Sequence, residues 1–214
     1  MAFFDRLIRP HFDRQFFEQA AEAVDGAFAS AFRRAASGEH SLPSQMAHAR
    51  GMDRYFAVQS AVMKAAVGCG AEEIRSQAGS FPMPLAKHRR FLVATSITDS
   101  LEHLRRSKAR RLLAGLNGFL EPFQPDLWDE AVEPKGEMLF GMLLIAKGGG
   151  ESQQLPSGIF FGVPSASLQS WHFYKPLSAV ISLYSEEGVE VPATKAPQLR
   201  KVPRSLSARS ENKK

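Results

Sequence analysis

An apolar stripe with helical spacing near the start of the chain constrains the fold more than any other feature. Apolar side chains recur every three or four residues from Phe12 to Ala31, and Pro10 stands just before them, where a helix readily begins. Ser37 and Gly38 interrupt the pattern. We expect one long helix whose wide apolar face is buried in a core or in a subunit interface. The candidate interface residues on this face are Phe12, Phe16, Phe28 and Phe32.

Further helical patterns and then strand patterns follow along the chain. Ser44 suits the N-cap of a second helix from Gln45 to Val67. A third helix is predicted over 100–114, with Thr98 or Asp99 as its N-cap. Strand character is found at 73–77, 90–98, 137–147, 158–163 and 171–174, and the segment 177–184 fits either a short helix or a strand.

The order of these elements, helices first and strands later, favours an α+β fold over a doubly wound α/β sheet. We expect a helical N-terminal third, then a small, mainly antiparallel β-sheet with one basic helix, and a disordered basic C-terminal tail. Residues 78–84 are predicted to form a loop, because a glycine and two prolines interrupt them. The expected divisions are a helical extension at 1–40, a core domain at 41–188 and a tail at 189–214 that is poor in large apolar residues.

The formal net charge of +5 is unevenly distributed along the chain. Residues 87–111 hold eight basic and two acidic residues, whereas residues 117–191 hold three basic and ten acidic residues. The last stretch, 192–214, holds seven basic residues and one acidic residue, so this stretch makes the protein basic. We therefore treat 87–111 and 192–214 as candidate contact surfaces for a polyanion.

The cations of residues 87–111, which we call the basic patch, are predicted to lie around one strand and the helix after it. Gathered there, they form a surface that contacts phosphates. The alternative is a solvated face whose cations pair with the acidic segment 117–191, within the monomer or across a homodimer. The candidate nucleic-acid-binding residues are Lys87, Arg89, Arg90, Arg105, Arg106, Lys108, Arg110 and Arg111.

Trp171 begins the densest aromatic cluster, at 171–175, and is the fifth candidate interface residue. Trp and Tyr are typical both of cores and of interface anchors, so the cluster fits either role.

The sequence contains no complete catalytic or ligand-binding motif. Neither a phosphate-binding loop nor a G-x-S-x-G nucleophile elbow occurs, and the six histidines do not stand at metal-ligand spacing. We therefore expect no metal and no cofactor. The chain has one cysteine, Cys69, and shows neither a signal segment nor an apolar run long enough to cross a bilayer. These features favour a cytoplasmic protein that does not act in a membrane.

One stretch of the chain resembles the core of the restriction endonucleases. It includes the helical segment RGMDRYFAVQSAVMKAA at 50–66, a pair of strands, and an apolar strand that ends at Lys147. Members of that superfamily use an Asp and a Glu to hold a divalent metal, with a Lys two residues after the Glu. Ile145 stands where that Glu would be, so the resemblance implies either a core without catalysis or a divergent site that uses Asp99 and Glu137.

These observations favour a non-catalytic regulatory or accessory binding protein of a macromolecular assembly. Its expected contact is a protein partner or a second copy of the chain, with nucleic acid as a further candidate through the basic patch. One alternative is a divergent metal-dependent nuclease with a restriction-endonuclease-like core. A second alternative is a self-assembling structural protein that uses the Phe-rich first helix. An enzymatic role is left open, with the non-catalytic role preferred.

Overall fold

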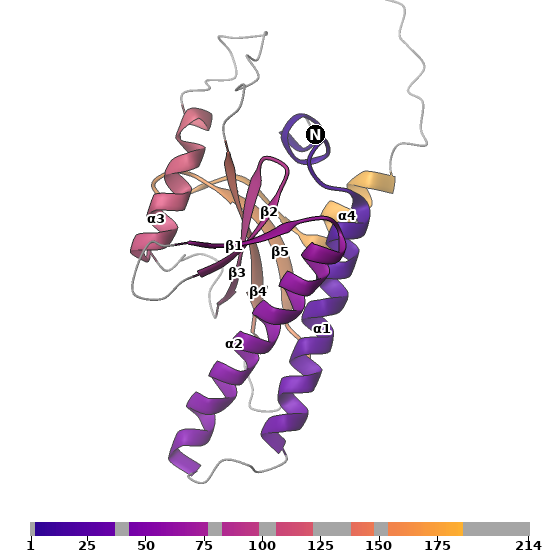
Figure 1. Ribbon diagram of the computed structural model, residues 1–214, viewed down its shortest axis with the longest axis vertical. Coiled ribbons are helices and arrows are strands. Elements are labelled where there is room, and N and C mark those ends of the chain that lie inside the picture. The colour runs from indigo at the N-terminus through magenta and orange to yellow at the C-terminus, as the bar shows by residue number, and fades with distance from the viewer. Residues whose placement is uncertain are drawn as a thin grey trace, which may run out of the picture.

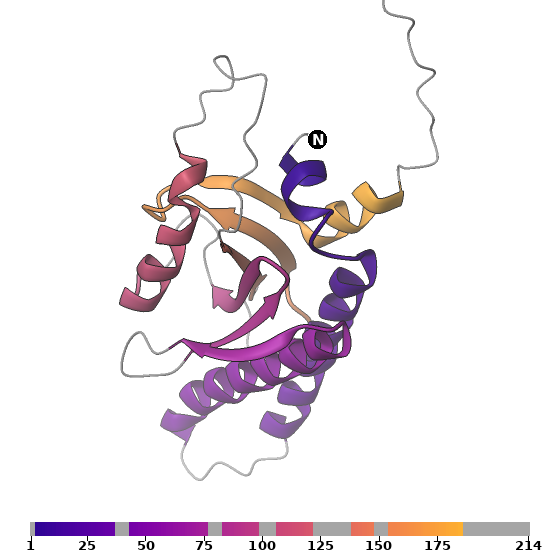
Figure 2. The same ribbon diagram turned by 45° about the horizontal axis from the view of Figure 1, so that its top comes forward.

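The computed structural model describes residues 3–36, 43–76, 83–98, 106–121, 138–147 and 154–185. They form an α+β fold in which helices lie on both faces of one six-stranded, mostly antiparallel sheet (Figure 1, Figure 2). The predicted fold class is confirmed. The helices are η1 (Phe4–Ile8), α1 (Arg14–Ala36), α2 (Pro43–Gly68), α3 (Lys108–Ala114), η2 (Gly115–Leu120) and α4 (Leu177–Ser185). The strands are β1 (Glu72–Ser76), β2 (Met83–His88), β3 (Phe91–Thr98), β4 (Leu139–Ala146), β5 (Gly158–Pro164) and β6 (Trp171–Pro176).

The strands lie in the order in which they occur in the chain, from β1 at one edge to β6 at the other. Neighbouring strands are antiparallel except β3 and β4, which run parallel. A parallel pair needs a connection that returns the chain to its starting end, and α3 and η2 lie in this connection. The strands predicted at 137–147 and 158–163 are confirmed as β4 and β5, which pair with each other in antiparallel orientation.

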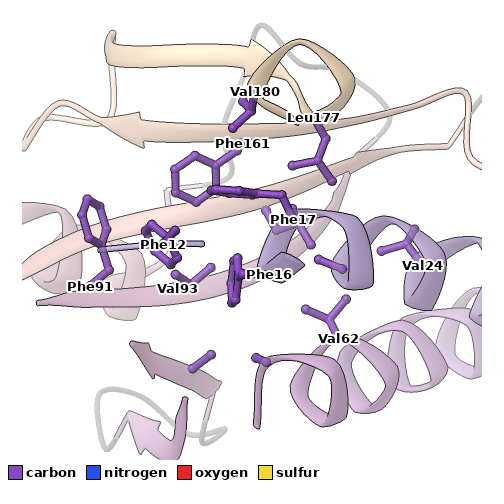
Figure 3. Close-up of a cluster of buried hydrophobic side chains, with 14 of the residues drawn as sticks. Phe12, Phe16, Phe17, Val24, Val62, Phe91, Val93, Phe161, Leu177 and Val180 are labelled. Atoms are coloured by element: carbon purple, nitrogen blue, oxygen red, sulfur yellow. The ribbon is translucent and has the colours of Figure 1, made fainter. Parts of the chain in front are cut away.

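The sheet separates two apolar clusters, because successive side chains of a strand point to opposite faces. The larger cluster lies on one face, where aromatic side chains of α1 pack on the sheet together with residues of α2 and α4 (Figure 3). On the other face, Leu113 and Ala114 of α3 pack on the sheet. In β3, Phe91 and Val93 belong to the larger cluster, and Leu92 belongs to the other.

The two long helices agree with the sequence periodicity, and they lie side by side (Figure 1). Arg33 and Arg34 lie in the last turn of α1, where positive charge interacts favourably with the helix dipole. Phe12 and Phe17, at the start of this segment, pack into the same cluster as the sheet residues. Most of α1 is therefore held by tertiary packing.

Two secondary-structure predictions need correction. The third helix does not extend over 100–114, because Arg106 and Ser107 are not helical and Ser107 is the N-cap of α3. The segment predicted as a loop over 78–84 contains the first residues of β2. Pro84 pairs with Arg75 of β1 but lies outside the register that β2 shares with β3, so its missing N–H breaks no bond to β3.

The ambiguous segment 177–184 is a helix, α4. The predicted domain boundaries near residues 40 and 188, and the predicted tail at 189–214, lie outside the described residues.

Candidate functional site

The cations of the basic patch next to the β2–β3 turn are engaged by neighbouring groups. Lys87 lies 3.1 Å from a carboxylate oxygen of Glu72 on β1. Arg89 has a φ of 52° in the two-residue turn between β2 and β3, a conformation that non-glycine residues rarely adopt. Its guanidinium donates to the carbonyl oxygen of Pro10, just after η1. These two cations therefore have local structural partners.

The cations of α3 divide into one structural residue and a group of exposed residues. Arg110 donates from Nη2 to the Ser96 hydroxyl of β3 over 2.8 Å, and its backbone N–H donates to the Ser107 hydroxyl at the N-cap. Arg110 therefore ties α3 to the sheet. Arg106, Lys108 and Arg111 are exposed on or beside α3. Arg105, the remaining candidate, lies outside the described residues.

The structure does not gather the basic patch into one surface. Arg90 precedes the start of β3, whereas Ser96, the contact of Arg110, lies near its end. Six residues of extended strand separate these two positions by about 20 Å. The described part of the patch that stays exposed as a group is therefore Arg106, Lys108 and Arg111.

Most of the candidate interface aromatics belong to the chain's own core. Phe12, Phe16 and Phe28 are buried, and the rings of Phe12 and Phe16 lie 4.8 Å apart within the larger cluster (Figure 3). Phe32 and Trp171 are partly exposed. The Trp171 ring lies over Gly162 of β5, where an added Cβ would come within 2.6 Å of it. The first three side chains thus offer no exposed surface to a partner in this fold.

A groove lies between α2 and the β1–β2 hairpin. Its volume is about 640 Å³. Side chains of α2 form one wall and side chains of β1 and β2 form the other. The wall residues used below are Phe56, Met63, Val67, Glu73, Arg75 and Pro84.

The α2 wall of the groove combines apolar side chains that are open to solvent with the polar side chains of Gln59, Ser60 and Lys64. Phe56 is 53% exposed, Val67 is 48% exposed, and Met52, one turn before Phe56, is 41% exposed. Met52, Phe56, Met63 and Val67 recur at helical spacing, so they form one stripe along α2, which we call the α2 stripe. The opposite face of α2 carries Val58, Val62 and Ala66 into the core. The sequence analysis predicted this helix but did not identify the stripe.

Three charged side chains line the groove, Lys64 on α2 and the pair Glu73 and Arg75 on β1. On β1, the guanidinium of Arg75 lies 3.9 Å from the carboxylate of Glu73, and both side chains are largely exposed. Both side chains point to the α2 side of the sheet, because Ile74 between them packs with the cluster on the α3 side. The β1 wall of the groove therefore presents one negative and one positive charge two residues apart.

Cys69, at the end of α2, is poorly suited to nucleophilic chemistry. Burial, with a smaller contribution from the carboxylate of Asp13, raises the pKa of its thiol. The thiol donates to Oε1 of Gln19 on α1 over 3.1 Å. A raised pKa favours the thiol over the reactive thiolate, so Cys69 acts as a packing residue between the two long helices.

The positions important for a nuclease site lie on and around β4. Ile145, where the catalytic Glu would stand, is fully buried in the larger apolar cluster. Asp99 and Glu137 lie outside the described residues. Glu137 precedes β4 and Lys147 follows it, and the eight residues of this extended strand span about 23 Å. A shared site for Glu137 and Lys147 would have to bridge most of that length.

Within the described ranges, no group of three or more His, Cys, Asp or Glu side chains is placed to hold a metal ion. In the same ranges, no helix is both long enough and apolar enough to cross a membrane. No protein-family model, curated protein or solved structure matches this chain.

Proposed function

We propose that this chain is a non-catalytic accessory protein of a macromolecular assembly and that it binds a protein partner through the groove between α2 and β1. The observation that carries the proposal is the α2 stripe beside an edge strand. Single exposed apolar residues are common on proteins, but several of them along one side of a helix, next to a groove, are typical of an interaction site.

The strand wall adds a second reason for a protein partner. Among the described strands, β1 has only β2 as a neighbour, so one side of its backbone is open to pairing. Open strand edges pair readily with an extended segment of another chain. A partner in the groove would gain main-chain hydrogen bonds from β1 and apolar contacts from α2.

The lining of the groove suits binding better than acid–base catalysis. Among its described lining residues, Glu73 is the one carboxylate, and histidine and cysteine do not occur. General acid–base catalysis needs a titratable group with a suitable pKa beside the substrate. The remaining polar groups of the groove are a lysine, an arginine, a serine and a glutamine, which serve recognition.

Site-specific photo-crosslinking in the full chain tests this proposal. Phe56 is replaced by the photoreactive analogue p-benzoylphenylalanine, and the protein is irradiated in cells of its natural host. The matched control carries the analogue at Leu155, which is 55% exposed but lies far along the chain before β5. We expect a discrete protein adduct from position 56, with a yield several times that from position 155. Equal yields from the two positions would refute the proposed site.

A second candidate function, contact with nucleic acid, has its own observation. Arg106, Lys108 and Arg111 are exposed together, and in the described part of the chain no acidic side chain forms a salt bridge with them. Three unpaired cations on one short segment can contact phosphates, and such binding weakens as salt rises.

Charge reversal separates this contact from general electrostatics. The triple variant R106E/K108E/R111E leaves Arg110 and its bond to Ser96 in place. The control R6E/R33E/K175E changes the net charge equally at exposed cations elsewhere. We expect the first variant to lose at least about tenfold in affinity for duplex DNA or RNA and to lower the salt slope by about 3. Equal losses in the two variants, measured by fluorescence anisotropy, would assign the binding to net charge alone.

A further inference from the structure

We propose that the partner in the groove is a second copy of this chain, joined by antiparallel pairing of the two β1 strands about Ile74. This inference rests on the proposed binding role of the same surface and names its occupant. It places the contact of a self-assembling protein on α2 and β1 rather than on the Phe-rich first helix.

The two edges of the sheet differ in their capacity to accept another strand. β6 ends at Pro176, and a register irregularity at Val163 and Pro164 disturbs its pairing with β5. Proline and irregular pairing are features that discourage edge-to-edge association. β1, with the sequence Glu-Glu-Ile-Arg-Ser, contains no proline and pairs in unbroken register with β2. Of the two edges, β1 is the one suited to continuing the sheet.

The charges of β1 are complementary to themselves under a two-fold axis. In an antiparallel pair centred on Ile74, Glu73 lies opposite Arg75 of the second copy, and Arg75 lies opposite Glu73 of the second copy. Opposite charges in directly facing positions stabilise an antiparallel pair, and like charges destabilise it. A pair centred on Glu73 would set two carboxylates against each other, and one centred on Arg75 would set two guanidinium groups against each other. Of these three symmetric registers, the charges favour the one centred on Ile74.

The same two-fold axis covers the α2 stripe. The axis runs perpendicular to the sheet, so both copies keep their α2 helices on the same face of a continuous twelve-stranded sheet. Glu73 and Arg75 line the groove of each copy, beside Phe56 and Val67. The two stripes then face each other above the paired β1 strands. A second copy of the chain therefore accounts at once for the open strand edge, the alternating charges and the exposed apolar stripe. An unrelated partner would need its own strand, its own charges and its own apolar surface to match these three features.

Charge-swap variants of the full chain test the pairing directly. Glu73→Arg places arginine opposite arginine in a homodimer, and Arg75→Glu places glutamate opposite glutamate. Mixing the two variants restores opposite charges at both facing positions, as does the double variant E73R/R75E. Because the side chains of Glu73 and Arg75 are exposed, we expect both single variants to fold. The mixture is the control for folding, since misfolded variants would not regain association when they are mixed.

Sedimentation equilibrium measures the dimer dissociation constant of each sample. We expect each single variant to raise this constant at least about tenfold, and the equimolar mixture and the double variant to restore it to within about threefold of the original chain. Single variants that dimerise as well as the original chain, or a mixture that stays as weak as its components, would overturn the proposed pairing.

A disulfide at the axis tests the register. In a Cys69→Ser background, Ile74→Cys places two cysteines opposite each other, with Cα atoms about 4.5–5.5 Å apart, which a disulfide can bridge. We expect a covalent dimer on mild oxidation, and none from the control Leu155→Cys in the same background. If position 74 forms no more dimer than position 155, the β1 register is excluded.

The two proposals fail in different ways. If the chain is monomeric in all samples while photo-crosslinking at Phe56 captures a different protein, the second copy is refuted and the binding role of the groove is retained. If position 56 gives no adduct above the Leu155 control, both proposals fall.

Discussion

At the scale of single residues, Asn117 makes more structural hydrogen bonds than its sequence context suggested. It follows α3 within η2, and its side chain is fully buried. Its Oδ1 accepts from the backbone N–H of Phe140 over 2.9 Å, while its Nδ2 donates to the carbonyl oxygens of Phe140, 3.0 Å away, and Pro164, 2.7 Å away. One amide thereby fixes η2, which lies within the β3–β4 connection, to both β4 and β5. In the sequence, Asn117-Gly118 indicates only irregular chain.

Asn117→Ala should therefore destabilise the fold strongly. It leaves one backbone donor and two backbone acceptors buried without their partner, and we expect the free energy of unfolding to fall by about 3 kcal/mol. Urea denaturation measures this change. The neighbouring Gly118→Ala is the matched control, because a Cβ there meets no atom within 4 Å. A loss for Asn117→Ala no larger than for the control would show that these hydrogen bonds contribute little net stability.

His172 of β6 makes stability depend on pH. Burial lowers the pKa of this histidine, and the nearby carboxylate of Glu121 opposes that effect more weakly. Its Nε2 is buried without a hydrogen-bond partner among the described residues. The unfolded chain, in which the pKa is about 6.5, binds the proton more readily than the folded chain. The stabilising effect of neutral His172 is therefore complete above that pH and is lost as the pH falls toward the lower folded-state pKa.

We expect His172→Gln to reduce the loss of stability between pH 7.5 and 5.5. The same substitution at the exposed His48 on α2, His48→Gln, is the matched control. Urea denaturation of the three proteins at both pH values makes the comparison. Asp25, whose pKa burial raises, acts in the opposite direction, because the folded chain binds its proton more readily than the unfolded chain. Parallel pH profiles for the original chain and His172→Gln would contradict the assignment.

At the scale of the elements, two glycines show how the same substitution has opposite effects in a helix and in the sheet. Gly26 is exposed in the middle of α1, and an added Cβ would meet no atom within 4 Å. Gly162 lies in β5 beneath Trp171, whose Cζ3 atom would be 2.6 Å from an added Cβ. The indole ring is rigid and packed against Tyr174, with ring centroids 5.1 Å apart.

Gly26→Ala should raise the free energy of unfolding by about 0.5–1 kcal/mol, because alanine favours the helix over glycine. Gly162→Ala should lower it by about 1–3 kcal/mol, because the indole must move out of its packed position. Thermal and urea denaturation of both variants measure the two effects. Effects of the same sign would show that one of the two local environments is misassigned.

The elements also explain why the basic patch divides. An extended β3 keeps the turn cations at one end and the α3 contact at the other, and Arg110 is turned inward to Ser96. Sequence spacing alone places the candidates close together, but their positions in space depend on the length of the strand between them. The stripe on α2 was missed for a related reason, since periodicity does not reveal which of two apolar faces the rest of the chain covers.

At the scale of the whole molecule, the basic character resides in the last part of the sequence. Residues 192–214 hold seven basic residues and one acidic residue, whereas the chain as a whole has a net charge of +5. Attraction to polyanions that depends on total charge should therefore depend mainly on this segment.

Replacing those seven Lys and Arg residues by Gln should abolish most retention of the full chain on heparin at low salt. The melting temperature of the chain, measured by circular dichroism and compared with that of the original chain, serves as the control for folding. Retention equal to that of the original chain would assign the attraction to the exposed cations of α3.

The sequence by itself determined the elements whose signals are local. The 3.6-residue periodicity specified α1 and α2, runs of β-branched and apolar residues specified β3, β4 and β5, and their order predicted the α+β class. These features depend on side chains close together in the chain, so pattern and propensity were sufficient. The start of α3 was not determined in this way, because several residues could cap it and Ser107 does.

Only the tertiary structure decided which surfaces face solvent. Burial of Phe12, Phe16 and Phe28, the role of Asn117, the separation of the cations and the exposure of the α2 stripe all depend on contacts between residues distant in sequence. The position of β1 at the edge likewise depends on the order of six strands, which no single segment encodes. A side chain's burial is a property of its neighbours in space, and those neighbours are set only when the whole chain has packed.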